Sequence, residues 1–338
     1  SNSNSTLNNT YSPNYLNQNN SNAAYQSFSL SFTEPWLFDT PNLVGGSYFY
    51  TARGQGQSNY LPFDTQQQGG TLRWGRRFKW PDYYFRGSWS LNIKNTRYIG
   101  SLDMLQYDFE ESSITKDNLI EGYATRSGVS ISQTISRDSR NHPEFPTKGS
   151  SFKWTSTFAG SFLGGDEDYH KHVFDIKWFS PIYEFNYGRN NKNISKFALF
   201  QNIKIGVVKK LPPSGNDDRS IVPPSSRFLM GGSGIPYGNM LRGYEENSVG
   251  QFYGKILLKY SMEFRVSLSD SPTMYALVFM EAGNVWKDFE DVDTKMFDLY
   301  KSVGFGGRIF MPMLGMLGYD IGYGFDHHND AVDLYPYT

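Results

Sequence analysis

Apolar and polar residues alternate with a period of two along most of the chain, which is the pattern of β-strands with one apolar and one polar face. In residues 251–268 the apolar side chains occupy mostly even positions and the polar ones mostly odd positions. Twelve segments show this alternation: residues 24–34, 43–54, 68–80, 83–98, 121–137, 148–160, 168–184, 195–209, 251–268, 273–287, 299–312 and 316–327. Because no stretch of ten or more residues has a convincing helical period, we predict an all-β fold.

The predicted strands are long, and the connections between them alternate in length. Most segments have 11 to 18 residues, whereas soluble strands usually have about 5–6 and a tilted membrane strand needs about 9–11. Short connections occupy residues 80–82, 269–273 and 312–315, and long ones occupy residues 55–67, 99–120 and 210–250. Short turns on one rim and long loops on the other are typical of outer-membrane barrels. We therefore predict a transmembrane antiparallel β-barrel, with a soluble all-β protein as the disfavoured alternative.

The composition supports a barrel that crosses the membrane with strands. The 338 residues include 24 Tyr, 26 Phe and 7 Trp, yet the mean hydropathy is −0.54. The longest apolar run, residues 274–280, is far shorter than the ~20 residues that a spanning helix needs. Several tryptophans lie at predicted strand ends, where we expect them to form interfacial girdles: Trp36, Trp74, Trp80, Trp178 and Trp286.

The sequence offers little support for catalysis. A net charge of −1 gives no global attraction for nucleic acid, and the absence of cysteine excludes disulfides and thiolate nucleophiles. We interpret His170 and His172 as part of a polar lumen face, and the loop pair His327 and His328 as equally unsuited to a metal. No G-x-S-x-G motif or phosphate-binding glycine loop occurs. We predict a non-enzymatic protein with no cofactor and no bound metal.

Five motifs stand in order along the chain. They are SFTEPWLF (31–38), RDSRNHPEFPTKGS (137–150), RFLMGG followed by LRGY (227–244), EAGNVW (281–286) and SVGFGGRIFMPMLGMLGYDIGYGF (302–325). The turn motif in 137–150 consists of Asp138, Arg140, Phe145, Pro146, Thr147 and Gly149. The loop motif in 227–244 consists of Gly231, Gly232, Leu241, Arg242, Gly243 and Tyr244. Together the five motifs resemble the BamA-type outer-membrane insertases, with LRGY in place of V-R-G-F and Glu in place of Asp in D-x-G-x-V-W.

The resemblance implies a sixteen-stranded barrel in the bacterial outer membrane, which folds and inserts other β-barrel proteins without chemistry. In the register of the motifs, residues 24–34 correspond to the family's fourth strand. We therefore expect an incomplete barrel domain in residues 24–338, with about twelve strands, two unpaired edges and no POTRA domain. The absent strands would flank the weak seam at which client strands are thought to pair. The Ser/Asn-rich residues 1–23 are expected to form an extracellular loop.

The resemblance also places loop 210–250 inside the barrel lumen and gives Arg242 two partners, Glu263 and Glu281, on the next two strands. The alternation agrees for Glu263, which lies on the polar face of its strand. For Glu281 the alternation is undecided, because its face also carries large apolar residues. A guanidinium binds carboxylates with a bidentate fork that lysine lacks. The alternative is an arginine on a mobile extracellular loop, and in either case Gly243 is expected to permit a turn with positive φ.

The partners follow from the resemblance alone. They are unfolded outer-membrane protein clients, accessory lipoproteins of the assembly complex, a chaperone that delivers clients, and membrane lipid, whereas nucleic acid is not expected. Two other functions stay open. One is a two-partner-type secretion pore of the same superfamily, some members of which share the R-G-[FY] loop, and the other is a passive porin.

Overall fold

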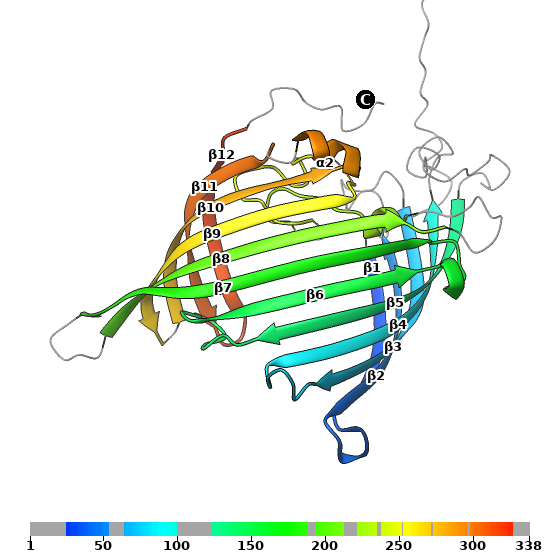
Figure 1. Cartoon of the computed structure of the whole chain (residues 1–338), viewed down its shortest axis with the longest axis horizontal. Helices are drawn as coiled ribbons and strands as arrows, with labels where there is room; N and C mark the ends of the chain where they lie inside the picture. The colour runs from blue at the N-terminus through cyan, green and yellow to red at the C-terminus, as the bar shows by residue number, and fades with distance from the viewer. Residues whose placement is uncertain are drawn as a thin grey trace, which may run out of the picture.

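In a computed structural model of the chain, twelve antiparallel strands form one sheet in which each strand pairs with its neighbours in sequence (Figure 1). The structure describes residues 25–53, 64–99, 123–187, 193–212, 222–234, 238–251, 253–271, 273–295 and 298–326. The strands are β1 (Tyr25–Glu34), β2 (Asn42–Arg53), β3 (Asp64–Arg77), β4 (Phe85–Ile99), β5 (Tyr123–Asp138), β6 (Gly149–Ala159), β7 (Tyr169–Tyr187), β8 (Asn193–Lys210), β9 (Ile256–Asp270), β10 (Thr273–Trp286), β11 (Tyr300–Met311) and β12 (Gly315–Gly324). The predicted all-β antiparallel fold is confirmed.

The strand bounds differ from the predicted ones by three residues or fewer, except at the starts of β3 and β9. Before β9, Gly254 forms an antiparallel bridge with Phe228, and the N–H of Lys255 donates to the carbonyl of Trp286 at 2.9 Å. These residues therefore belong to the end of the loop. Because the loop end covers it, Trp286 is 5% exposed and does not occupy the girdle position predicted for it, whereas Trp80 is 83% exposed.

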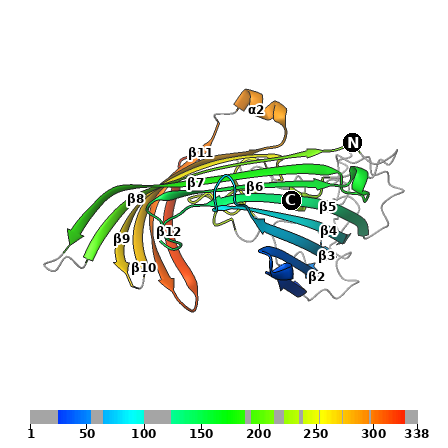
Figure 2. The same cartoon turned by 60° about the horizontal axis from the view of Figure 1, so that its bottom comes forward.

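The sheet is strongly curved, like a segment of barrel wall (Figures 1 and 2). Its edges are β1 and β12, each of which pairs with a single neighbour in the part of the chain that the structure describes. This is the open sheet with two unpaired edges that the register of the motifs predicts. The predicted extracellular loop 1–23 lies outside the described residues.

The two faces of the wall differ in what covers them. The described parts of the loop between β8 and β9 (residues 211–255) pack against the face that carries Glu263 and Glu281, here called the inner face. On the opposite, outer face large apolar side chains are exposed, and Phe28, Leu30 and Phe32 of β1 are 59%, 67% and 70% exposed. Exposed apolar side chains on one face of a sheet suit contact with lipid. Among the described residues, no helix is long and apolar enough to cross a membrane.

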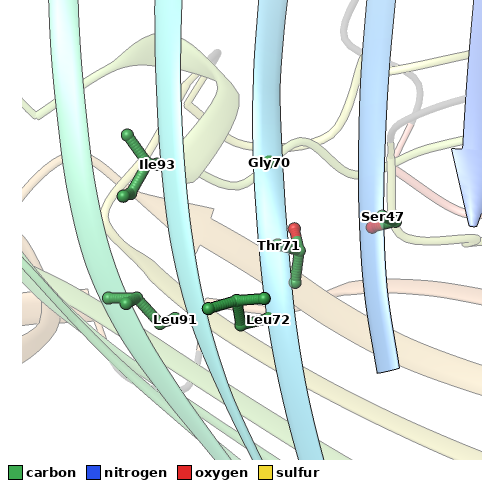
Figure 3. Close-up of a pocket in the computed structure, with 6 residues that line it drawn as sticks. All are labelled: Ser47, Gly70, Thr71, Leu72, Leu91 and Ile93. Carbon is green, nitrogen blue, oxygen red and sulfur yellow. The ribbon is translucent and has the colours of Figure 1, made fainter. Parts of the chain in front are cut away.

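Short helical segments occur only in connections within the described ranges. The longest is α2 (Phe289–Lys295), which follows β10 and projects from one rim of the wall (Figure 2). A shallow hollow lies on β3 and β4 between Leu72, Leu91 and Ile93, beside Gly70 (Figure 3). The hollow shares no residue with the loop on the inner face, so it does not position the site described next.

Candidate functional site

Arg242 of loop 211–255 lies against carboxylates of the inner face. Its Nη2 is 2.7 Å from Oε1 of Glu263 in β9 and 2.9 Å from Oε1 of Glu281 in β10. The three side chains are 5%, 7% and 0% exposed, so both ion pairs are buried between loop and wall. Burial by itself lowers the pKa of Arg242, but the nearby carboxylates, Glu281 first, raise it above its ordinary value.

Glu281 holds both the backbone and the side chain of Arg242. Its Oε2 accepts a hydrogen bond from the backbone N–H of Arg242 at 2.8 Å, while its Oε1 accepts from the guanidinium. The Nζ of Lys259 is 3.1 Å from the same Oε1. Glu263 is shared in a similar way, because Arg265 donates from Nε to its Oε2 at 2.8 Å. Each carboxylate is thus paired with two cations, which compensates for the cost of burying its charge.

An aromatic ring supports the guanidinium. The guanidinium carbon of Arg242 lies 3.6 Å from the ring centroid of Phe279, a cation–π contact. Phe279 lies on the inner face together with Glu281, as do the equally buried Tyr275 and Leu277. These apolar residues left the face of Glu281 undecided in the sequence. Phe145 of the turn between strands β5 and β6 and Arg242 of the loop cover this stretch, which therefore accommodates apolar side chains on the inner face.

Gly243 lets the loop lie directly on β12. Its φ is +89°, the positive value expected for this residue. A Cβ at Gly243 would stand 2.8 Å from the backbone nitrogen of Gly324 and 2.8 Å from the carbonyl carbon of Tyr323. The next residue, Tyr244, donates from its hydroxyl to the carbonyl of Lys301 in β11 at 2.6 Å. The loop motif therefore spans the inner face from β9 to β12.

The rest of the loop motif shapes the packed interior of the loop. Leu241 lies in a buried apolar cluster between loop and wall, which also contains Met230, Val208, Leu257 and Val285. Gly231 and Gly232 have φ values of +138° and +51°, and Gly232 forms an antiparallel bridge with Leu241. The glycines thus allow the loop to fold back on itself, while its apolar residues pack on the wall rather than face water.

The turn motif closes the connection between β5 and β6. Arg140 donates to both carboxylate oxygens of Asp138, at 2.8 and 2.7 Å. Gly149 has a φ of +103°, and a side chain there would collide with the carbonyl of Ser139. The buried residues of this turn are Phe145, Pro146 and Thr147. Phe145 shares a buried cluster with Tyr275, Leu277 and Phe279, so the turn and the loop cover adjacent stretches of β10.

Four further charged residues at the site were not identified from the sequence: Lys259, Arg265, Arg308 and Asp320. Asp320 in β12 accepts a hydrogen bond from Nη1 of Arg242 at 3.4 Å. A signal for two of them was present, because Arg308 and Asp320 are the only charged residues of 302–325. Lys259 and Arg265 had no such signal, because polar residues alternate throughout their strand β9.

The predicted position of the histidine pair is wrong. Lys171, which stands between His170 and His172, lies on the inner face with its Nζ 4.6 Å from the ring centroid of Phe228 in the loop. The two histidines therefore face outward, where His172 contacts Trp154 and both contact Phe158. His327 and His328 lie outside the described residues. Within the described ranges, no three acidic or histidine side chains gather to hold a metal ion.

Comparison with known proteins adds a family and a structural neighbour. A family model described as the Omp85 superfamily domain matches residues 8–333. The chain is similar in structure to BamA from Haemophilus ducreyi lacking POTRA domains 1–3, with a TM-score of 0.70 and 15% sequence identity. The match covers 90% of this chain and 60% of that one, so the chain spans about 60% of the length of that structure. Comparison with curated protein sequences returned no match.

The curved antiparallel wall, its apolar outer face and its charged inner face define an integral outer-membrane β-barrel protein. The family match covers nearly the whole chain. The chain belongs to the Omp85 superfamily, and its wall has the fold of a BamA-type barrel.

Proposed function

We propose that the chain acts as an insertase, which folds β-barrel proteins and inserts them into the bacterial outer membrane. The observation that carries the proposal is the burial of Arg242 between Glu263 and Glu281, which fixes a long loop inside the curved wall. This is the arrangement that the resemblance to BamA-type insertases implies. A porin's constriction loop has no need of an Arg-Gly-Tyr element bound to acids of the wall.

Strand pairing drives the proposed mechanism, and no chemical bond is made or broken. In the described part of the chain, β1 and β12 each lack a partner on one side. Such edges expose backbone N–H and C=O groups, whose unsatisfied exposure to lipid is costly. A client strand that adds to an opened edge satisfies these groups by β-augmentation. We place the weak seam on the side of the wall where β1 and β12 lie.

The loop has a supporting role in this mechanism. Through Arg242 and Tyr244 it contacts β9, β10, β11 and β12 at once. It therefore stiffens this part of the wall from inside while the seam opens. The proposed partners are unfolded β-barrel clients, accessory lipoproteins and a delivering chaperone, and lipid covers the outer face.

Depletion of the protein from its own cells tests the proposal. The measurement is the amount of folded β-barrel proteins in the outer membrane. If the chain is an insertase, the amount of folded barrels in the outer membrane declines generally and unfolded barrels accumulate in the periplasm. Wild-type protein restores the amount of folded barrels, and Arg242→Gln restores it poorly. Loss of one secreted protein with other barrels unchanged would identify a secretion pore instead. A large, steady conductance in liposomes with unchanged barrel levels would identify a porin.

A further inference from the structure

Asp320 is bound by arginines from two different parts of the chain. Arg308 of β11 donates from Nη1 to Oδ1 and from Nη2 to Oδ2, both at 2.7 Å. Arg242 of the loop donates from Nη1 to Oδ2 at 3.4 Å. The carboxylate therefore extends the buried ion pairs of the loop, which begin at Glu263 on β9, as far as the arginine of β11.

Glycines on the facing strands leave room for this pair. In the β11–β12 ladder, Gly306 lies opposite Asp320 and Gly318 lies opposite Arg308. A Cβ at Gly318 would stand 2.7 Å from Cδ of Arg308, and a Cβ at Gly306 would collide with Oδ1 of Asp320. A side chain at either position would displace Arg308 or Asp320 from the place it has in the bidentate contact, so the two glycines leave room for the pair.

The strand that carries Asp320 is an edge. Within the described residues, β12 pairs with β11 alone, so a single ladder holds it in the sheet. The loop adds a second attachment from inside, because a Cβ at Gly322 would stand only 2.8 Å from the backbone nitrogen of Gly243. Asp320 is the charged part of that second attachment.

We propose that Asp320 and Arg308 are positioning residues that couple the lumen loop to the edge strand β12. One carboxylate serves both arginines, so release of Arg242 from the wall loosens β12, and loosening of β12 releases the loop. Such coupling is reciprocal by thermodynamic necessity. The coupling goes beyond the proposed insertase function and does not depend on it, since it is a property of the chain without any client.

Hydrogen exchange of the full-length protein in lipid nanodiscs measures both ends of the coupling at once. The two readouts are the backbone amides of β12 and those of loop residues 238–251. For Asp320→Asn we expect exchange to accelerate in both segments, on the order of tenfold, because charge-assisted hydrogen bonds to both arginines are weakened. Arg308→Lys, which keeps the charge but loses the bidentate fork, replaces this variant if Asp320→Asn does not fold.

Asp175→Asn is the matched control. Asp175 is an inner-face carboxylate of β7 that pairs with Lys177 at 3.3 Å and accepts from Asn202. It is removed by several strands from the ladder of β11 and β12. Its replacement is expected to leave exchange in β12 at the wild-type rate.

A charge-swapped double variant distinguishes coupling between the loop and β12 from an ion pair that stabilises the β11–β12 hairpin alone. Arg308→Asp combined with Asp320→Arg restores an ion pair between the two strands but places a second guanidinium beside Arg242. Coupling predicts that β12 regains protection at least in part, while the loop still exchanges fast. Two results would overturn the proposal: full recovery of the loop in the swapped variant, or acceleration confined to β12 in Asp320→Asn.

Discussion

The ring of Phe145 packs against the ring of Tyr275, with centroids 5.0 Å apart and planes inclined by 49°. Phe145 belongs to the turn between β5 and β6, whereas Tyr275 lies on the inner face of β10. Beside them, the hydroxyl of Thr273 donates to Glu144 Oε2 at 2.6 Å. The turn therefore reaches across the inside of the curved wall. The turn motif and the loop motif, which lie far apart in the sequence, meet on one strand.

Replacement of Phe145 by alanine is expected to destabilise the folded wall by roughly 3–5 kcal/mol, since a buried ring is lost and a cavity remains. The measurement is the temperature at which the folded protein converts to its unfolded mobility on a gel. Phe162→Ala is the control, because this ring is 79% exposed. Equal decreases in this temperature for the two variants would contradict the conclusion that the turn stabilises the wall through Phe145.

Arg242→Gln is expected to detach the loop from the wall, because two buried carboxylates lose a cation that they share. Breaking one buried pair costs roughly 3–5 kcal/mol, and water in a lumen reduces this value. Arg242→Lys should recover part of the loss, since it keeps the charge without the fork. Limited proteolysis of the loop measures detachment.

Lys255→Gln is the control for this prediction. It removes an ion pair at the end of the same loop, but the partner Asp288 is 52% exposed, and such surface pairs contribute little. If Arg242→Gln were as resistant to protease as Lys255→Gln, the ion pairs of Arg242 would not hold the loop in place.

Glu281→Gln should detach the loop more than Glu263→Gln. Glu281 accepts both the backbone N–H and the guanidinium of Arg242, whereas Glu263 accepts from Arg242 only through the guanidinium. The same proteolysis assay ranks the two variants, and the opposite order would show that the backbone contact is dispensable.

Gly243→Ala is expected to lift the loop from β12, because the added methyl group would meet the backbone of Tyr323 and Gly324. Gly164→Ala provides a matched control. Its φ of +76° is similarly positive, but nothing lies within 4 Å of the added Cβ. Both variants carry the cost of a left-handed backbone for a residue with a side chain, so the difference between their exchange rates at β12 isolates the steric effect. Identical rates would refute the close contact.

The strands and their faces were largely predictable, because the alternation of apolar and polar residues records the lipid on one face of each strand and the water on the other. β9 illustrates this, since its polar residues face the inner side and its apolar residues face outward. The alternation did not predict the face of Glu281, the burial of Trp286 or the outward position of His170. Each of these depends on what covers the strand, and the covering segment comes from elsewhere in the chain.

By itself the sequence determined the antiparallel order of twelve strands, the long loop before β9 and the charged residues available to it. A period of two records the contrast between lipid and water, which any strand in such a wall meets on its own. Only the tertiary structure decided that Phe279 lies beneath Arg242 and that Asp320 joins the loop to β12. These contacts unite residues from distant strands, and burial by a non-local segment reverses the local rule that polar side chains mark the lumen face.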